Sequence, residues 1–183
     1  MPRFVFVVLL VAAANAAAQA PAPSAIWIDV PYVHQPSEGC GAASLAMVME
    51  YWAQQQGHAA GADSDVGVIQ RALYSPSEHG ILASQMQTYL REHGYEVLAL
   101  AGRWSDLEAQ LGKGRPLIVA LQPAGQSALH YVVLDGVDPA RELVTMNDPA
   151  ERKLLSQERA AFEKDWNATG NWMLLAVPAP ASH

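Results

Sequence analysis

The order of its hydrophobic patterns is what most constrains the fold of this chain. From residue 40 to residue 112, apolar side chains recur mainly at the spacing of helices, whereas from residue 116 to residue 177 they form short runs mostly bounded by Gly, Pro or Asp. A helical half followed by a strand-rich half is typical of an α+β fold with a mostly antiparallel sheet. A cleft between the two halves is the natural place for a site.

The same patterns predict the individual elements. The first helix begins at Cys40 and runs to about Gln56, with apolar residues on its buried side. Further helices are expected near 65–73, 82–93, 106–112 and 157–166, and Ser105 with Glu108 predicts a capping box for the third of these. Strands are expected at 95–100, 116–122, 130–137, 142–147 and 171–177, after an extended stretch over 26–33.

The first twenty residues have the features of a secretory signal peptide. Arg3 is followed by eleven apolar residues and then by small residues that end at Ala18-Gln19-Ala20. A membrane-spanning helix needs about 20 apolar residues, so an uncleaved anchor is the weaker interpretation. We therefore expect an exported protein, periplasmic or secreted, with no stable membrane insertion after signal removal.

The remaining residues 21–183 are enough for one domain with a substantial core, and no repeat or linker divides them. Without Arg3, 10 basic residues face 18 acidic ones, which leaves a net charge of −8. This charge argues against nucleic acid and anionic membrane surfaces as partners.

Cys40 is the only cysteine, although exported proteins normally use cysteines in pairs. Taken alone, it is explained about as well by a non-catalytic role, as a buried thiol or as one half of an intermolecular bridge, as by a catalytic one. Its context favours a catalytic thiolate: it lies between Gly39 and Gly41 at the predicted start of a helix, where unpaired N–H groups and the helix dipole favour S⁻. The side-chain amide of Gln35, five residues earlier, could donate a hydrogen bond to an oxyanion.

A thiolate enzyme also needs a base and a group that orients the base. His130 opens one predicted strand, and the next strand ends at Asn147-Asp148 after the turn Asp138-Pro139-Ala140. Such a hairpin brings the start of its first strand beside the end of its second. Because successive side chains alternate between the faces of a strand, only one of Asn147 and Asp148 can face the histidine ring. Each residue alone has a simpler explanation, a core histidine or a turn-forming Asp-Pro, but their joint occurrence favours a Cys-His-Asp triad.

Three stretches of the sequence together resemble a known family. Residues 35–52, 130–136 and 144–149 are similar to the bacteriocin-leader, or double-glycine, cysteine peptidases of the papain-like clan. The resemblance implies a papain-like fold with Cys40 as nucleophile, His130 as acid and base, Asp148 as orienting carboxylate and Gln35 in the oxyanion hole. The best-known members are fused to a transporter with an ATP-binding domain, whereas this sequence has no Gly-x-x-x-x-Gly-Lys loop. Neither ATP nor leader-peptide specificity is therefore expected, and the chain looks like a stand-alone exported form.

We expect no cofactor and no metal, because four histidines outside the triad lack a spacing such as His-Glu-x-x-His (His34, His58, His79 and His93). The leading functional hypothesis is a cysteine endopeptidase that cuts peptides or proteins through an acyl-enzyme. An amidase or acyl transferase acting on small peptides or cell-wall material would use the same triad. A non-catalytic peptide-binding module is the third alternative, although such a module would usually lack one of the four residues.

Overall fold

A computed structural model of the protein describes residues 24–180, so the predicted signal segment lies outside the described residues. An antiparallel sheet in the order β2-β7-β3-β4-β5-β6 forms the centre of the fold, and a seventh strand, β1, pairs with β4 outside this path. The strands are β1 (Ile26–Trp27), β2 (Tyr95–Ala101), β3 (Leu117–Leu121), β4 (His130–Asp138), β5 (Leu143–Asp148), β6 (Arg152–Glu158) and β7 (Trp172–Pro178).

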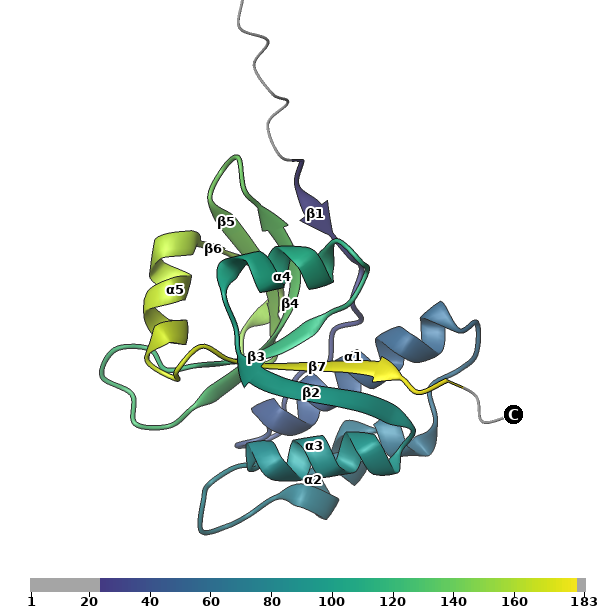
Figure 1. Ribbon diagram of the computed structural model, residues 1–183. Helices are drawn as coiled ribbons and strands as arrows, with labels where there is room; N and C mark the ends of the chain where they lie inside the picture. The colour runs from purple at the N-terminus through teal and green to yellow at the C-terminus, as the bar shows by residue number, and fades with distance from the viewer. Residues whose placement is uncertain (1–23, 181–183) are drawn as a thin grey trace, which may run out of the picture.

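Helices cover both faces of this sheet. Figure 1 shows α1, α2 and α3 on one side of strands β2 and β7, and α4 on the other side. The helices are α1 (Cys40–Gln55), α2 (Val66–Leu73), α3 (Ala83–Glu92), α4 (Trp104–Leu111) and α5 (Arg159–Asn167), with a short 3₁₀ turn at Ala62–Ser64. The α+β class with a mostly antiparallel sheet is confirmed.

Alternation along β4 divides the core into two layers. Val133 packs in a cluster with α1 and α3, whereas Val132 and Leu134 pack in a second cluster with α4 and α5. The second cluster includes Phe162 and Trp166, which are almost fully buried. Because each face of the sheet is covered, β3 and the middle of β4 read as continuous apolar runs.

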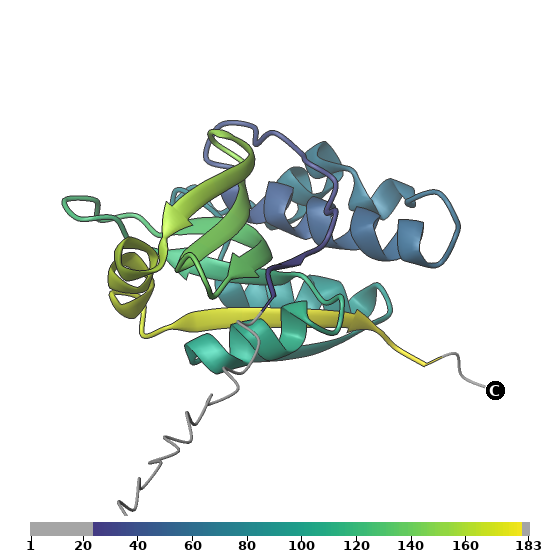
Figure 2. The ribbon, with the colours of Figure 1, turned by 90° about the horizontal axis from the view of Figure 1, so that it is seen from above.

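The chain between β1 and α1 crosses the sheet and leads directly to the cysteine. Figure 2 shows this segment, in purple, beside the green strands β4 and β5. The backbone N–H of Ile28 donates to the carbonyl of Asp135 at 2.8 Å, and the N–H of Gln35 donates to the carbonyl of Pro149 at 3.0 Å. Of the predicted extended stretch 26–33, only Ile26 and Trp27 form a strand, and the residues after them have no strand pairing.

The structure differs from the sequence-based expectations at one strand and at the start of one helix. Strand β6 was not predicted, because its mostly exposed sequence has too few apolar side chains for a strand signal, and pairing with β5 defines it. The capping box of Ser105 and Glu108 is wrong: α4 begins at Trp104, and the carboxylate of Asp106 accepts the backbone N–H of Arg103 at 2.8 Å. The burial of Trp104 explains the earlier start.

Among the described residues, no helix has both the length and the apolar character needed to cross a membrane.

Candidate active site

Cys40 is the first residue of α1, and its thiol is partly accessible. A turn over residues 36–39 leads into the helix, and the N–H of Gly39 donates to the carbonyl of Pro36 at 3.0 Å. A Cβ atom on Gly39 would lie 2.5 Å from Cγ of Pro36, so the turn has no room for a side chain there. Gly39 provides no side-chain cap, and the N-terminal N–H groups of α1 are therefore free to act on the thiol.

His130 and Asp148 meet as the hairpin register predicts. His130 is the first residue of β4 and Asp148 is the last residue of β5, and the histidine Nε2 lies 2.9 Å from Oδ1 of the carboxylate. The same oxygen accepts the N–H of Ala150 at 2.8 Å, so the turn after β5 holds the carboxylate in place. With Nε2 bound to the carboxylate, Nδ1 is the ring nitrogen left for the thiol.

Electrostatics favour a charged imidazole beside the thiol. Burial alone lowers the pKa of His130, but hydrogen bonds with Asp148 and Cys40, together with the charges of both groups, outweigh burial and raise the pKa to about 9. Burial raises the pKa of Asp148, but the hydrogen bond and charge of His130, with the N–H groups of Ala150 and Glu151, lower it overall. Imidazolium and carboxylate therefore coexist at neutral pH.

Asn147 faces away from this arrangement and has a structural role. Its side chain is fully buried. Its Nδ2 donates to the carbonyl of Val30 at 3.0 Å, and its Oδ1 accepts the N–H of Leu154 at 3.0 Å. The structure thus places Asp148 rather than Asn147 against the histidine, and Asn147 ties the N-terminal segment to the turn between β5 and β6.

Gln35 lies on the N-terminal segment where this segment meets the turn after β5. Its backbone N–H is bound to Pro149, directly after Asp148. Its side-chain Oε1 is buried and has no hydrogen-bond partner. Such an unsatisfied buried oxygen is costly in an ordinary structural position, which sets this amide apart from the satisfied amide of Asn147.

The sequence comparison decides the family. The model of the Peptidase_C39 like family matches residues 27–173, which span the cysteine helix, the histidine strand and the aspartate turn. The chain belongs to this family. It is therefore a cysteine peptidase, a hydrolase.

Solved structures of peptidases share the fold of this C39-like peptidase. A C39-like peptidase from Bacillus anthracis is 18% identical with a TM-score of 0.63, and the match covers 85% of this chain and 98% of that one. The peptidase domain of Streptococcus ComA, a bi-functional ABC transporter involved in a quorum sensing pathway, is 20% identical with a TM-score of 0.64, covering 82% and 99% of the two chains.

A double glycine motif protease from an AMS/PCAT transporter, solved in complex with the leader peptide, is 22% identical with a TM-score of 0.60. This match covers 84% of the chain and 94% of that structure. At these sequence identities, the similarity to the three structures shows that the fold is shared. The resemblance of the sequence to the papain-like clan predicts this fold. No curated protein sequence matches the chain.

The peptidase has separate cavities beside Cys40 and beside His130. One cavity of about 250 Å³ is lined by Cys40, residues 78–82 and residues 127–129, and by Tyr131. An adjoining apolar cavity of about 250 Å³ shares Leu129 and Tyr131 and extends to Trp172. A separate cavity of about 290 Å³ lies beside His130 and Asp148. The cavity that holds Cys40 therefore adjoins an apolar cavity with room for a substrate side chain.

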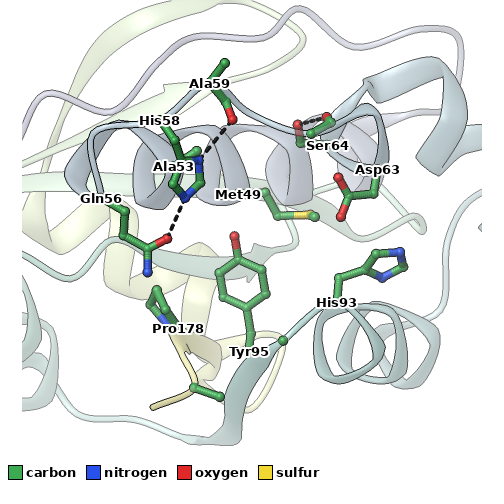
Figure 3. Close-up of a pocket in the computed structure, with 13 residues that line it drawn as sticks. Met49, Ala53, Gln56, His58, Ala59, Asp63, Ser64, His93, Tyr95 and Pro178 are labelled. Carbon is green, nitrogen blue, oxygen red and sulfur yellow. Dashed lines mark hydrogen bonds between the residues drawn. The ribbon is translucent and has the colours of Figure 1, made fainter. Parts of the chain in front are cut away.

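A larger cavity, of about 400 Å³, lies elsewhere. Figure 3 shows it at the C-terminal end of α1, opposite to Cys40, with Tyr95 between His93 and Gln56. The ring of His58 contacts Oε1 of Gln56 at 2.9 Å and the carbonyl of Ala59 at 3.0 Å. The size of this cavity alone would suggest an active site, but its lining contains no cysteine. Within residues 24–180, no cluster of three potential metal ligands occurs.

Two tyrosines next to the Cys-His-Asp group have no counterpart in the sequence reasoning. Burial and the nearby charge of Cys40 raise the pKa of Tyr131 to about 12, so this ring stays neutral beside the thiol. Burial and the charge of Asp148 raise the pKa of Tyr32. The position of Tyr131 directly after His130 was visible in the sequence, but nothing there indicated that its ring packs at the start of α1.

Proposed function

We propose that the protein is an endopeptidase that cleaves peptide bonds through a thioester acyl-enzyme, with Cys40 as nucleophile. The observation that carries the proposal is the placement of His130, which is bound to Asp148 at 2.9 Å and carries a raised pKa beside Cys40. This arrangement favours the thiolate–imidazolium pair that a cysteine peptidase requires.

Acylation follows from this pair. The sulfur of Cys40 attacks the carbonyl carbon of the scissile peptide bond, a C–S bond forms, and the carbonyl oxygen becomes an oxyanion. The backbone N–H of Cys40 and the amide of Gln35 donate hydrogen bonds to this oxyanion. When the tetrahedral intermediate collapses, the C–N bond breaks and the imidazolium of His130 gives its proton to the leaving amine.

Deacylation uses the histidine in the opposite direction. Neutral His130 takes a proton from a water molecule whose oxygen attacks the thioester carbonyl carbon. Collapse of the second intermediate breaks the C–S bond, releases a carboxylic acid and restores the thiolate and the imidazolium. Asp148 keeps the ring oriented through both steps and stabilises its charged form.

The substrate class proposed is a peptide or a peptide segment of a protein. The two adjoining cavities beside Cys40 support it, as does the structurally similar double glycine motif protease, which was solved with a leader peptide. The transporter-linked specificity of that protease is not part of the proposal.

A peptide library tests this function. The protein without residues 1–20 is incubated with a proteome-derived peptide mixture in water containing ¹⁸O, and new C-termini are identified by mass spectrometry. We expect cleavage products that carry one ¹⁸O atom and that disappear in the Cys40→Ala variant. Cleavage that persists in Cys40→Ala, or release of ammonia from side-chain amides without new C-termini, would overturn the proposal.

We also propose that the protein acts outside the cytoplasm. The basic start, apolar core and small residues of the first twenty positions support this proposal. Expression in a bacterial host followed by fractionation and N-terminal sequencing tests it. The expected product is an extracytoplasmic chain that begins near residue 21, and an uncleaved cytoplasmic chain would contradict it.

A further inference from the structure

The wall of the cleft beside Cys40 is formed by a loop over residues 75–80, between α2 and α3. The N–H of Ser75 donates to the carbonyl of Gly80 at 2.9 Å, and the N–H of Glu78 donates to the carbonyl of Ser75 at 3.2 Å, so the loop closes on itself. Glu78, His79 and Gly80 line the same cavity as Cys40. The position of this loop therefore sets the width of the cleft next to the thiol.

Glu38, two residues before Cys40, holds this loop. The hydroxyl of Tyr74, at the start of the loop, donates to Oε2 of Glu38. Nδ1 of His79, near the end of the loop, lies 3.1 Å from Oε1 of the same carboxylate. The carboxylate of Glu38, in the turn before α1, thus contacts both ends of the 75–80 loop, with one oxygen at Tyr74 and the other at His79.

Backbone geometry indicates that these contacts hold two unfavourable conformations. Glu38 has φ of 53° and His79 has φ of 50°, so both lie in the left-handed region that residues other than glycine seldom adopt. Such conformations persist where the surrounding structure favours them over relaxed alternatives. Here the side chains of the two left-handed residues bind each other.

The charge state of Glu38 suits this role. The hydrogen bond from Tyr74 is the main reason why the pKa of Glu38 is lowered, so the carboxylate is ionised at neutral pH. Hydrogen bonds to an ionised acceptor are about twice as strong as those between neutral groups. The side chain of His79 is 76% exposed, so its contact with Glu38 is the weaker of the two and Tyr74 carries more of the effect.

We propose that Glu38 is a positioning residue of the peptidase, which fixes the 75–80 loop as a wall of the substrate cleft and thereby sets substrate affinity. Glu38 acts through Tyr74 and His79 and does not touch the reacting atoms. The inference rests on the proposed function, because this cleft binds substrate only if Cys40 is the nucleophile.

Four variants test the proposal: Glu38→Ala, Glu38→Gln, Tyr74→Phe and, as a matched control, Glu142→Ala. Glu142 is also an exposed glutamate in the left-handed region, with φ of 52°, but it lies in the turn between β4 and β5. We expect Glu38→Ala to raise KM about fivefold while kcat stays within about twofold of the parent. Glu38→Gln keeps one acceptor oxygen, so its KM should lie between those of the parent and of Glu38→Ala. The KM of Glu142→Ala should match that of the parent.

Two further readouts separate positioning from general damage. In Glu38→Ala, alkylation of Cys40 by iodoacetamide should keep its parental rate, and the amides of residues 75–80 should exchange hydrogen faster. Adding Tyr74→Phe to Glu38→Ala should raise KM no further, because both changes remove the same contact. An unchanged KM with unchanged exchange, a slowed alkylation, or fully additive effects would overturn the proposal. If the parent cleaves no peptide, the exchange measurement still reports on the loop, so failure of the proposed function is recognised separately.

Discussion

Asp148 is a residue whose charge, more than its shape, matters for the proposed chemistry. Its carboxylate is one of the two groups that raise the pKa of His130, and its Oδ1 is fixed by the N–H of Ala150. Replacement by asparagine keeps an oxygen near the ring but removes the negative charge. Replacement by alanine removes both, and leaves the ring free to turn.

We therefore expect Asp148→Ala to lower kcat/KM by about 100-fold and Asp148→Asn to lower it less. In a thiolate–imidazolium enzyme, activity at high pH is lost when the imidazolium loses its proton. Because Asp148 raises the pKa of His130, the alkaline limb of the pH–activity profile should move from near pH 9 to lower pH in both variants. A limb that stays in place would mean that Asp148 does not act on the histidine.

Asp135 is a buried carboxylate on β4 that lies outside the proposed mechanism. It is fully buried at a bulge in the pairing with β5, and neither of its oxygens has a hydrogen-bond partner. Burial raises its pKa to about 7, although the charge of Lys153 opposes this effect. The folded protein therefore holds a proton here that the unfolded chain releases near pH 4.

Between about pH 4 and pH 7, Asp135 ionises in the unfolded chain but stays protonated in the folded protein, so the stability of the fold decreases as the pH rises. Above about pH 7 both states are ionised and the loss is constant. Asp135→Asn removes this ionisation, so its free energy of unfolding relative to the parent should rise by up to about 4 kcal/mol from pH 4 to pH 8. Urea unfolding of both proteins at several pH values measures this difference in free energy. A pH-independent difference between the two proteins would contradict the raised pKa.

At the scale of elements, the turn before α1 determines where the thiol lies. A Cβ on Gly39 would lie 2.5 Å from Cγ of Pro36 and 2.9 Å from the carbonyl oxygen of Pro36, so Gly39→Ala must displace the turn. We expect alkylation of Cys40 to slow at least about tenfold, with a loss of about 1–2 kcal/mol in stability.

Gly57→Ala is the matched control for this substitution. Gly57 has φ of 75° and open space around its Cα, so alanine there strains the backbone without a clash. It should lower the melting temperature and leave the alkylation rate unchanged. Equal alkylation rates in both variants would show that the turn does not position the thiol.

The elements differ in how far the sequence predicts them. The cysteine helix and the hairpin of β4 and β5 follow from local patterns: apolar spacing after Cys40, and turn residues between two apolar runs. Strand β6 was not predicted, because an exposed edge strand does not need alternating apolar residues. Only its pairing with β5 identifies it. Helix α4 begins at the buried Trp104, before the capping box that Ser105 and Glu108 predict, because burial of the tryptophan ring outweighs this local preference.

At the scale of the whole molecule, the candidate site is assembled from distant parts of the chain. Cys40 comes from the helical half, His130 and Asp148 come from the sheet, and Gln35 comes from a segment that crosses between them. The sequence predicted these four residues because their chemistry is distinctive. It did not predict how Glu38 joins Tyr74 and His79, because contacts between surface side chains some forty positions apart leave no local pattern.

The central claim is that Cys40 and His130 form a thiolate–imidazolium pair, and the rate of Cys40 alkylation by iodoacetamide across pH tests it most directly. The protein without residues 1–20 is compared with its His130→Ala variant by mass spectrometry. The account predicts fast labelling that persists well below pH 7 in the parent and is lost in the variant. Labelling that rises only near about pH 8.5 in both proteins, as for an ordinary thiol, would contradict it.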